Sequence, residues 1–154
     1  RVNTTGIIDF QWSTAGTSFL TAAMSTASGF VDGHGQWVRA TMDVDNGASG
    51  RTIKFYHSDD STDNPDFVTW TLMETVTQSG TTSIFANTAS LEISGDALGT
   101  LSPFAGRAHS AELRNGIGGT VVASPRVRGV TRGASSFTDA QGNTWTAAGG
   151  VTIE

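Results

Sequence analysis

Apolar and polar residues alternate most clearly between Trp37 and His57. Within residues 37–45, Val38, Ala40, Met42 and Val44 share one side of an alternating pattern, and within residues 51–57 Ile53 and Phe55 do the same. A period of two is typical of a strand with one buried side and one solvent-facing side. Asn46-Gly47-Ala48-Ser49-Gly50 lies between the two runs, and Asn-Gly readily takes the positive φ angles that reverse a chain. The pattern therefore predicts a long antiparallel hairpin.

Shorter alternating segments on both sides of this hairpin predict further strands. They cover residues 6–12, 19–24, 67–76, 82–85, 91–93, 106–114, 120–123, 136–139, 143–146 and 151–153. Trp70 shares a side of its strand with Val68 and Leu72, which predicts that Trp70 faces the core. Trp145 is expected to pair with Phe137 across the last hairpin. Short strands separated by turn residues at this spacing are typical of an antiparallel sandwich or barrel, and we favour the sandwich.

Composition and charge exclude several classes of protein. The chain has 154 residues, of which 37% are apolar and 15% charged, and this balance fits one globular domain with a real core. A net charge of -5 without a basic stripe argues against a nucleic-acid partner. No apolar run approaches the roughly 20 residues of a membrane-spanning helix, so we expect no membrane partner. The absence of cysteine excludes disulfides and cysteine-based zinc sites.

Four segments carry a resemblance to a known group of proteins. In chain order they read WVRATMDVDNGASGRTIKFYHSDD, TWTLMETVTQSGTTSIFANTASLEI, AELRNGIGGTVVASP and SFTDAQGNTWTAAGG. This series resembles a module of actinobacteriophage virion proteins that is common in minor tail proteins, and the resemblance extends from Ile7 to the C-terminus. It implies an all-β fold, an antiparallel β-sandwich of jelly-roll, laminin-G-like or concanavalin A-like type.

The chain departs from this group in two places. The short Ser-Asp-Gly…Trp loop of the group is replaced by the longer HSDDSTDNPDFVTW, and the modules carry further strands before the point where this chain starts. We therefore expect residues 1–154 to form a single β-sandwich domain, a fragment of a longer virion protein, that lacks N-terminal strands. A sheet edge left unpaired is a template for another chain, so this predicts contacts with other virion proteins and a homo-oligomer.

The resemblance and the residues suggest two functions. The first is a non-enzymatic structural or accessory module of a phage virion, located in the tail or on the particle surface. The alternative is a carbohydrate-binding module that recognises a glycan of the host cell envelope. Aromatic rings stack on sugars, and Trp12, Trp37 and Tyr56 are the candidate ligand-binding residues because we expect them to be exposed.

An acidic loop is the candidate metal site. Asp59, Asp60, Asp63 and Asp66 place hard oxygen ligands at close spacing, as Ca²⁺ requires, although the loop lacks the glycine and the final glutamate of an EF-hand. The same run reads equally well as a solvated charged segment. We expect no cofactor other than this Ca²⁺.

The candidates for catalysis are few. Asp43 and Asp45 share one side of a strand, and retaining glycosidases need two carboxyls about 5–5.5 Å apart. Both residues adjoin the Asn-Gly turn, however, which favours a turn-stabilising role. His34, His57 and His109 lie in unrelated contexts and no Gly-x-Ser-x-Gly is present, so the sequence does not favour a serine hydrolase.

Overall fold

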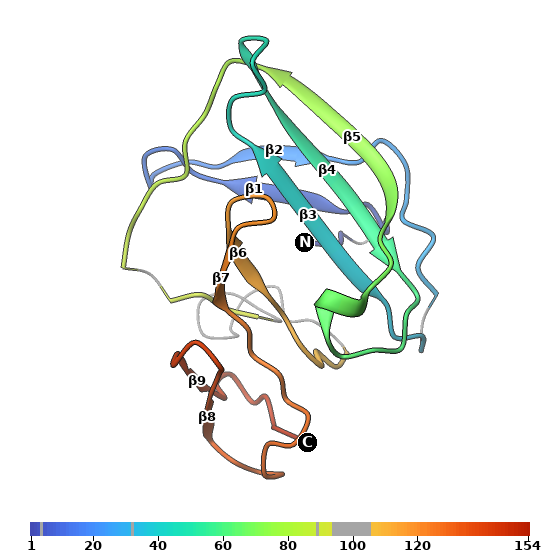
Figure 1. Ribbon diagram of the computed structural model, residues 1–154, viewed down its shortest axis with the longest axis vertical. Coiled ribbons are helices and arrows are strands. Elements are labelled where there is room, and N and C mark those ends of the chain that lie inside the picture. The colour runs from blue at the N-terminus through green and yellow to red at the C-terminus, as the bar shows by residue number, and fades with distance from the viewer. Residues whose placement is uncertain (4, 32, 89, 94–105) are drawn as a thin grey trace. The chain divides into compact units, whose positions relative to one another are not determined.

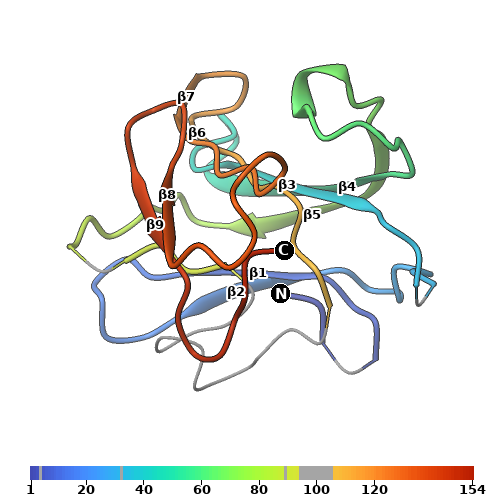
Figure 2. The same cartoon turned by 90° about the horizontal axis from the view of Figure 1, so that it is seen from below.

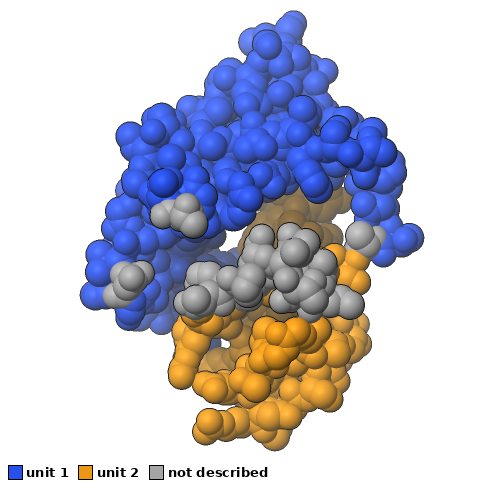
Figure 3. All heavy atoms as spheres, turned by 180° about the vertical axis from the view of Figure 1, so that it is seen from behind, with its two compact units in different colours: residues 1–88 blue, residues 89–154 orange. Residues whose placement is uncertain are grey.

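The chain divides into two compact units, Arg1–Thr88 and Ala89–Glu154 (Figures 1 and 3). The computed structural model describes residues 1–3, 5–31, 33–88, 90–93 and 106–154. These residues form antiparallel strands and one short 3-10 helix, without any α-helix, so the all-β prediction is confirmed. None of their helical segments has the length and apolar character to cross a bilayer. The expectation of a single sandwich domain stays a prediction.

Unit 1 contains two antiparallel sheets. The first pairs β1 (Asp9–Trp12) with β2 (Leu20–Ala23), and the second has the order β3 (Trp37–Asp43), β4 (Gly50–Ser58), β5 (Thr71–Ser79). A 3-10 helix, η1 (Pro65–Phe67), lies between β4 and β5.

The predicted central hairpin is confirmed as β3 and β4. Their register runs from Trp37 opposite Ser58 to Asp43 opposite Thr52. Asn46 closes the connection, because its backbone N–H donates to the Gly50 carbonyl at 2.9 Å. The connection thus contains the Asn-Gly pair as predicted, although β3 ends at Asp43 instead of Asp45 and β4 begins at Gly50 instead of Arg51.

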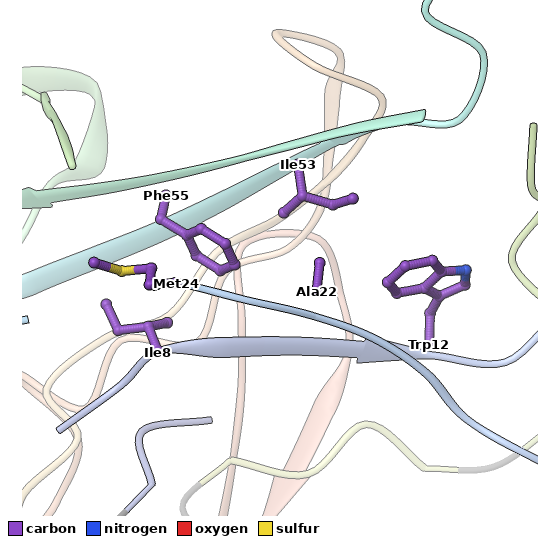
Figure 4. Packing of buried hydrophobic residues seen from close by; sticks show 6 residues of the cluster. All are labelled: Ile8, Trp12, Ala22, Met24, Ile53 and Phe55. Carbon is purple, nitrogen blue, oxygen red and sulfur yellow. The ribbon is translucent and has the colours of Figure 1, made fainter. Parts of the chain in front are cut away.

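The core of unit 1 lies between its two sheets (Figures 2 and 4). Buried side chains from β1, β2, β4 and the residues that adjoin β1 and β2 meet there, namely Ile8, Trp12, Ala22, Met24, Ile53 and Phe55. Ile53 and Phe55 have no exposed surface, as their shared side of the hairpin predicts. Trp12 is only 4% exposed, so the prediction that it is exposed is wrong. Trp12 has the same parity as the buried Ile8, which directly precedes β1, and this parity turns Trp12 toward the core.

A bulge in β5 changes which side chains face the core. Phe55 lies opposite Glu74 and Tyr56 opposite Leu72, so Met73 is an extra residue on β5. Such an extra residue shifts the alternation of the residues before it. Met73 accordingly packs against the core, whereas Leu72 is 50% exposed and Trp70 is half-buried beside the other face of the sheet. The prediction that Trp70 belongs to the core is therefore wrong.

Unit 2 contains two short hairpins. They pair β6 (Leu113–Asn115) with β7 (Thr120–Ala123) and β8 (Ser136–Thr138) with β9 (Thr144–Thr146). Phe137 lies directly opposite Trp145, which confirms the predicted cross-strand pair.

Several predicted strands are shorter or absent in the described residues. The segments 82–85, 91–93 and 151–153 are not strands, and of 106–114 only the last two residues belong to β6. The segment 82–85 shows the reason. Its amides bond to two separate parts of unit 1, Thr82 to the Val44 carbonyl at 3.0 Å and Phe85 to the Ser13 carbonyl at 2.8 Å. An alternating pattern becomes a strand only where one partner strand continues beside it.

Candidate functional site

Four large side chains gather on the face of the three-stranded sheet that is turned away from the core. Trp37 and Arg39 come from β3, Tyr56 comes from β4 directly opposite Arg39, and Trp70 precedes β5. We call these four residues the Arg39 cluster. All four are half-buried. Arg39 and Tyr56 share this face because they pair with each other and because Phe55, the neighbour of Tyr56 on β4, points to the core.

The guanidinium of Arg39 lies over two aromatic rings. Its central carbon is 4.2 Å from the ring centroid of Tyr56 and 4.4 Å from that of Trp70. Both distances are well within the range of a cation–π interaction. Trp37 meets Trp70 edge to face, with 6.2 Å between centroids and an interplanar angle of 77°. The guanidinium is therefore held against the rings of Tyr56 and Trp70, and Trp70 in turn contacts Trp37.

Within the described part of the chain, the side-chain nitrogens of Arg39 have no hydrogen-bond or ion-pair partner. Its Nε is buried and unbonded, and no hydrogen bond or ion pair joins the guanidinium to another described residue. A guanidinium carries five N–H donors in a rigid plane. Such donors suit oxygen atoms of a bound molecule, because carboxylate and hydroxyl oxygens accept in this geometry.

The acidic loop borders the Arg39 cluster. Trp37 Nε1 donates to the Thr62 carbonyl at 2.8 Å, and the preceding Gln36 donates through Nε2 to Asp59 at 2.6 Å. Asp60 accepts the backbone N–H of Thr69 at 2.5 Å, and this hydrogen bond lowers the pKa of Asp60. Asp59 and Asp60 thus hold the loop in place against the sheet.

The structure places the four predicted calcium ligands as follows. Asp59 and Asp60 bind protein donors, and Asp63 and Asp66 also make polar interactions. Across residues 1–3, 5–31, 33–88, 90–93 and 106–154, no three acidic or histidine side chains converge as a metal-binding group. Calcium binding by Asp59, Asp60, Asp63 and Asp66 stays a prediction.

Two of the three predicted ligand-binding aromatics lie together. Trp37 and Tyr56 belong to the Arg39 cluster, whereas Trp12 is in the core and donates through Nε1 to Thr82 Oγ1 at 2.9 Å. Sequence reasoning missed Arg39 and Trp70. The hairpin register could have identified Arg39, since it has the parity of Trp37 and falls opposite Tyr56. Trp70 could not be placed, because its direction depends on the bulge.

The carboxylates considered for catalysis bind the turn, and the three histidines belong to different segments of the chain. Asp43 accepts the backbone N–H of Asp45 at 3.3 Å, and Asp45 accepts that of Gly47 at 3.1 Å. These bonds support the turn-stabilising interpretation of the pair. His57 lies on β4, opposite Val38 of β3, and His34 is exposed in the loop before β3; both belong to unit 1, whereas His109 belongs to unit 2.

Asp139 organises a hydrogen-bond network in unit 2 that sequence reasoning missed. Its carboxylate accepts the backbone N–H groups of Ser124 at 3.0 Å and Asn143 at 2.9 Å, and the indole N–H of Trp145 at 3.0 Å. Burial alone raises the pKa of this carboxyl, but these hydrogen bonds outweigh burial and hold its pKa well below the ordinary value. Asp139 therefore ties the residue after β7 to the β8–β9 hairpin.

The Arg39 cluster is the best candidate for ligand contact among the described residues. It combines flat aromatic surface with oriented donors, which suits recognition of a polar ligand better than nucleophilic chemistry. No protein-family model, curated protein or solved structure matches the chain.

Proposed function

We propose that this chain is a non-enzymatic structural or accessory module of a phage virion, part of a minor tail protein. In this proposal it adopts the laminin-G-like, concanavalin A-like jelly-roll sandwich and packs against other virion subunits. The resemblance of the four quoted segments supports the virion setting. The hydrogen bonds that Asp43 and Asp45 make to the turn support a structural role for that carboxylate pair.

The observation that best supports the assembly role is that most strands lie at the edge of their sheet. Of the nine strands in the described residues, only β4 is hydrogen-bonded to a strand on each side. β3 is a seven-residue edge strand on which Val38 is 42% exposed and Ala40 is also exposed. An edge with unpaired N–H and C=O groups and exposed apolar side chains accepts a strand or a flat surface from another chain.

Charged residues on the β3 edge test this role. We expect the double variant Val38→Lys and Ala40→Lys to fold but to enter particles of the encoding phage at least tenfold less than wild type, because lysine blocks edge pairing. Ala140→Lys, in the exposed turn between β8 and β9, is the matched control and should enter normally. Particle composition is measured by quantitative mass spectrometry, and circular dichroism checks the fold. Absence of the wild-type chain from particles would overturn the proposal, and normal entry of the double variant would exclude the β3 edge.

A second function, binding of a host-surface glycan, is favoured by the Arg39 cluster. Protein sites for sugars combine an aromatic surface with planar hydrogen-bonding groups, and the cluster brings Trp37, Arg39 and Tyr56 together beside a polar loop. The guanidinium already covers one face of the Tyr56 ring. Trp37 is therefore the better platform for a sugar, and Arg39 the better hydrogen-bond donor.

Binding of the labelled protein to host cell envelopes tests the glycan function. Trp37→Ala and Arg39→Lys should weaken saturable binding about tenfold, because lysine lacks the planar fork. Phe19→Ala is the matched control, since Phe19 is 77% exposed and lies outside the cluster. A chelator in a parallel sample tests the predicted Ca²⁺. Equal binding by wild type and both cluster variants would exclude the cluster as the glycan site.

A further inference from the structure

The chain contains two Asn-Gly pairs, one in each compact unit. Asn46-Gly47 lies in the turn between β3 and β4, and Asn115-Gly116 lies at the start of the turn between β6 and β7. Both glycines have positive φ angles, 74° at Gly47 and 87° at Gly116. The two pairs are therefore alike in sequence and in local turn setting, and they differ in what surrounds the reactive atoms.

Asn-Gly pairs undergo a defined reaction. The glycine amide loses its proton, and its nitrogen attacks Cγ of the asparagine, so that a new N–Cγ bond forms while the Cγ–Nδ2 bond breaks. Nδ2 leaves as ammonia and a cyclic succinimide remains. Water then opens the ring to aspartate or isoaspartate, so the side-chain amide becomes a carboxylate. Glycine allows this attack because it has no side chain to hinder it.

At the first pair, hydrogen bonds hold all the reacting groups. Asn46 donates through Nδ2 to Thr52 Oγ1 at 3.1 Å and accepts the Ala48 N–H through Oδ1 at 3.0 Å. The attacking nitrogen of Gly47 donates to the carboxylate of Asp45 at 3.1 Å. A negative charge at this distance opposes loss of the amide proton, and the fixed side chain cannot turn its Cγ toward the nitrogen.

At the second pair, the same groups have no such partners. Asn115 and Gly116 are exposed, and within the described residues neither the Asn115 side chain nor the Gly116 N–H makes a hydrogen bond. The turn itself is nevertheless held by a backbone hydrogen bond, because the Gly119 N–H donates to the Gly116 carbonyl at 3.1 Å. The turn thus presents Asn115 to water at the tip of a formed hairpin.

We infer that Asn115 is a site of spontaneous deamidation in the folded protein and that Asn46 is protected from it. The product adds one negative charge to the β6–β7 turn. Isoaspartate also lengthens the backbone by one methylene at the residue that pairs with Thr120. Conversion of Asn115 therefore weakens its pairing with Thr120, the pair nearest the turn. The hairpin has only three paired positions on β6, so this loss affects a large part of it.

Peptide mapping by mass spectrometry after incubation of the whole chain in warm, mildly alkaline buffer tests this inference. We expect the Asn115 peptide to exchange NH for O at least tenfold faster than the Asn46 peptide while the protein is folded. In urea the two rates should converge, because both pairs are Asn-Gly. Equal rates in the folded protein, or faster conversion of Asn46, would overturn the inference.

Two variants test the reason for the protection. Asp45→Ala frees the Gly47 amide and Thr52→Val frees Nδ2 of Asn46, and each should accelerate conversion of Asn46 several-fold without changing the rate at Asn115. Circular dichroism and the retained rate at Asn115 show whether each variant is folded. Unchanged protection of Asn46 in both folded variants would contradict the role assigned to these hydrogen bonds.

Discussion

Phe55 is a central side chain of the unit 1 core. It is the larger of two side chains without any exposed surface, and it projects from the central strand β4 toward β1 and β2 (Figure 4). We predict that Phe55→Ala lowers the free energy of unfolding by about 3–5 kcal/mol, because the lost contacts leave a cavity. Phe19→Ala, at a position that is 77% exposed, should change it by less than about 0.5 kcal/mol. Urea denaturation measures the free energy of unfolding of both variants. A similar decrease in the two variants would contradict the central role of Phe55 in the core.

Asp139 makes the stability of unit 2 depend on pH. Its folded pKa lies below the ordinary value of 3.8, so between these two pKa values the unfolded chain binds a proton that the folded chain does not. The stabilisation is therefore complete above about pH 5 and is lost as the pH falls through the folded pKa. We predict that hydrogen-exchange protection of the Ser124 amide falls over this range. Asp139→Asn should lower protection at neutral pH and flatten its pH dependence, and an unchanged profile in this variant would assign the dependence to another group.

Single residues could be placed from the sequence where parity and register agree. Ile53 and Phe55 alternate with polar residues on a hairpin whose turn fixes the register, which predicts that both face the core, and both are buried. Asp139 could not be recognised, because its role depends on Ser124 from outside its own hairpin. Trp12 shows the limit of local reasoning, since its burial requires the β1–β2 sheet to pack on β4.

β4 is the element on which the three-stranded sheet depends. It pairs with β3 over seven positions and with β5 on its other side, so its backbone groups serve two ladders. We predict that Lys54→Pro, in the middle of β4, abolishes cooperative folding of unit 1, because proline removes an N–H and does not fit a central strand. Lys54→Thr keeps the N–H at this exposed position and should fold normally. Circular dichroism with thermal melting measures both, and a well-folded proline variant would show that β4 is not required.

The sequence identified elements best where a tight turn joins two alternating segments. β3–β4 and β8–β9 were both predicted as hairpins for this reason. Segments without an adjacent partner were over-predicted, as residues 82–85 show with their two separate hydrogen bonds. The bulge at Met73 had no local signal, and it decides the direction of Trp70 and hence the composition of the Arg39 cluster. Three members of the Arg39 cluster, Trp37, Arg39 and Tyr56, therefore follow from the hairpin register, whereas the position of Trp70 follows from an irregularity in the neighbouring strand.

At the scale of the whole molecule, the division into two compact units raises the question of whether they unfold together. The sequence predicts one domain, whereas the chain forms one compact unit up to Thr88 and a second from Ala89 (Figure 3). Tryptophan fluorescence can separate the two cases, because Trp145 is the only one of the four tryptophans in unit 2. Trp145→Phe removes that signal and also the indole donor to Asp139, so it weakens unit 2 while the remaining tryptophans report unit 1 alone.

We predict that the two units unfold independently, so that Trp145→Phe leaves the urea midpoint of the remaining fluorescence within error of wild type. Every member of the buried cluster of unit 1 lies within residues 8–55, which gives that unit a core of its own. A single cooperative domain would behave differently, because a loss of stability anywhere in it lowers the midpoint seen by every probe. Far-UV circular dichroism of the same samples supplies the control, since it follows both units and should show an earlier partial transition from unit 2. A common shift of fluorescence and circular dichroism would establish one domain and would make the hydrogen bonds of Asp139 part of the stability of the whole chain.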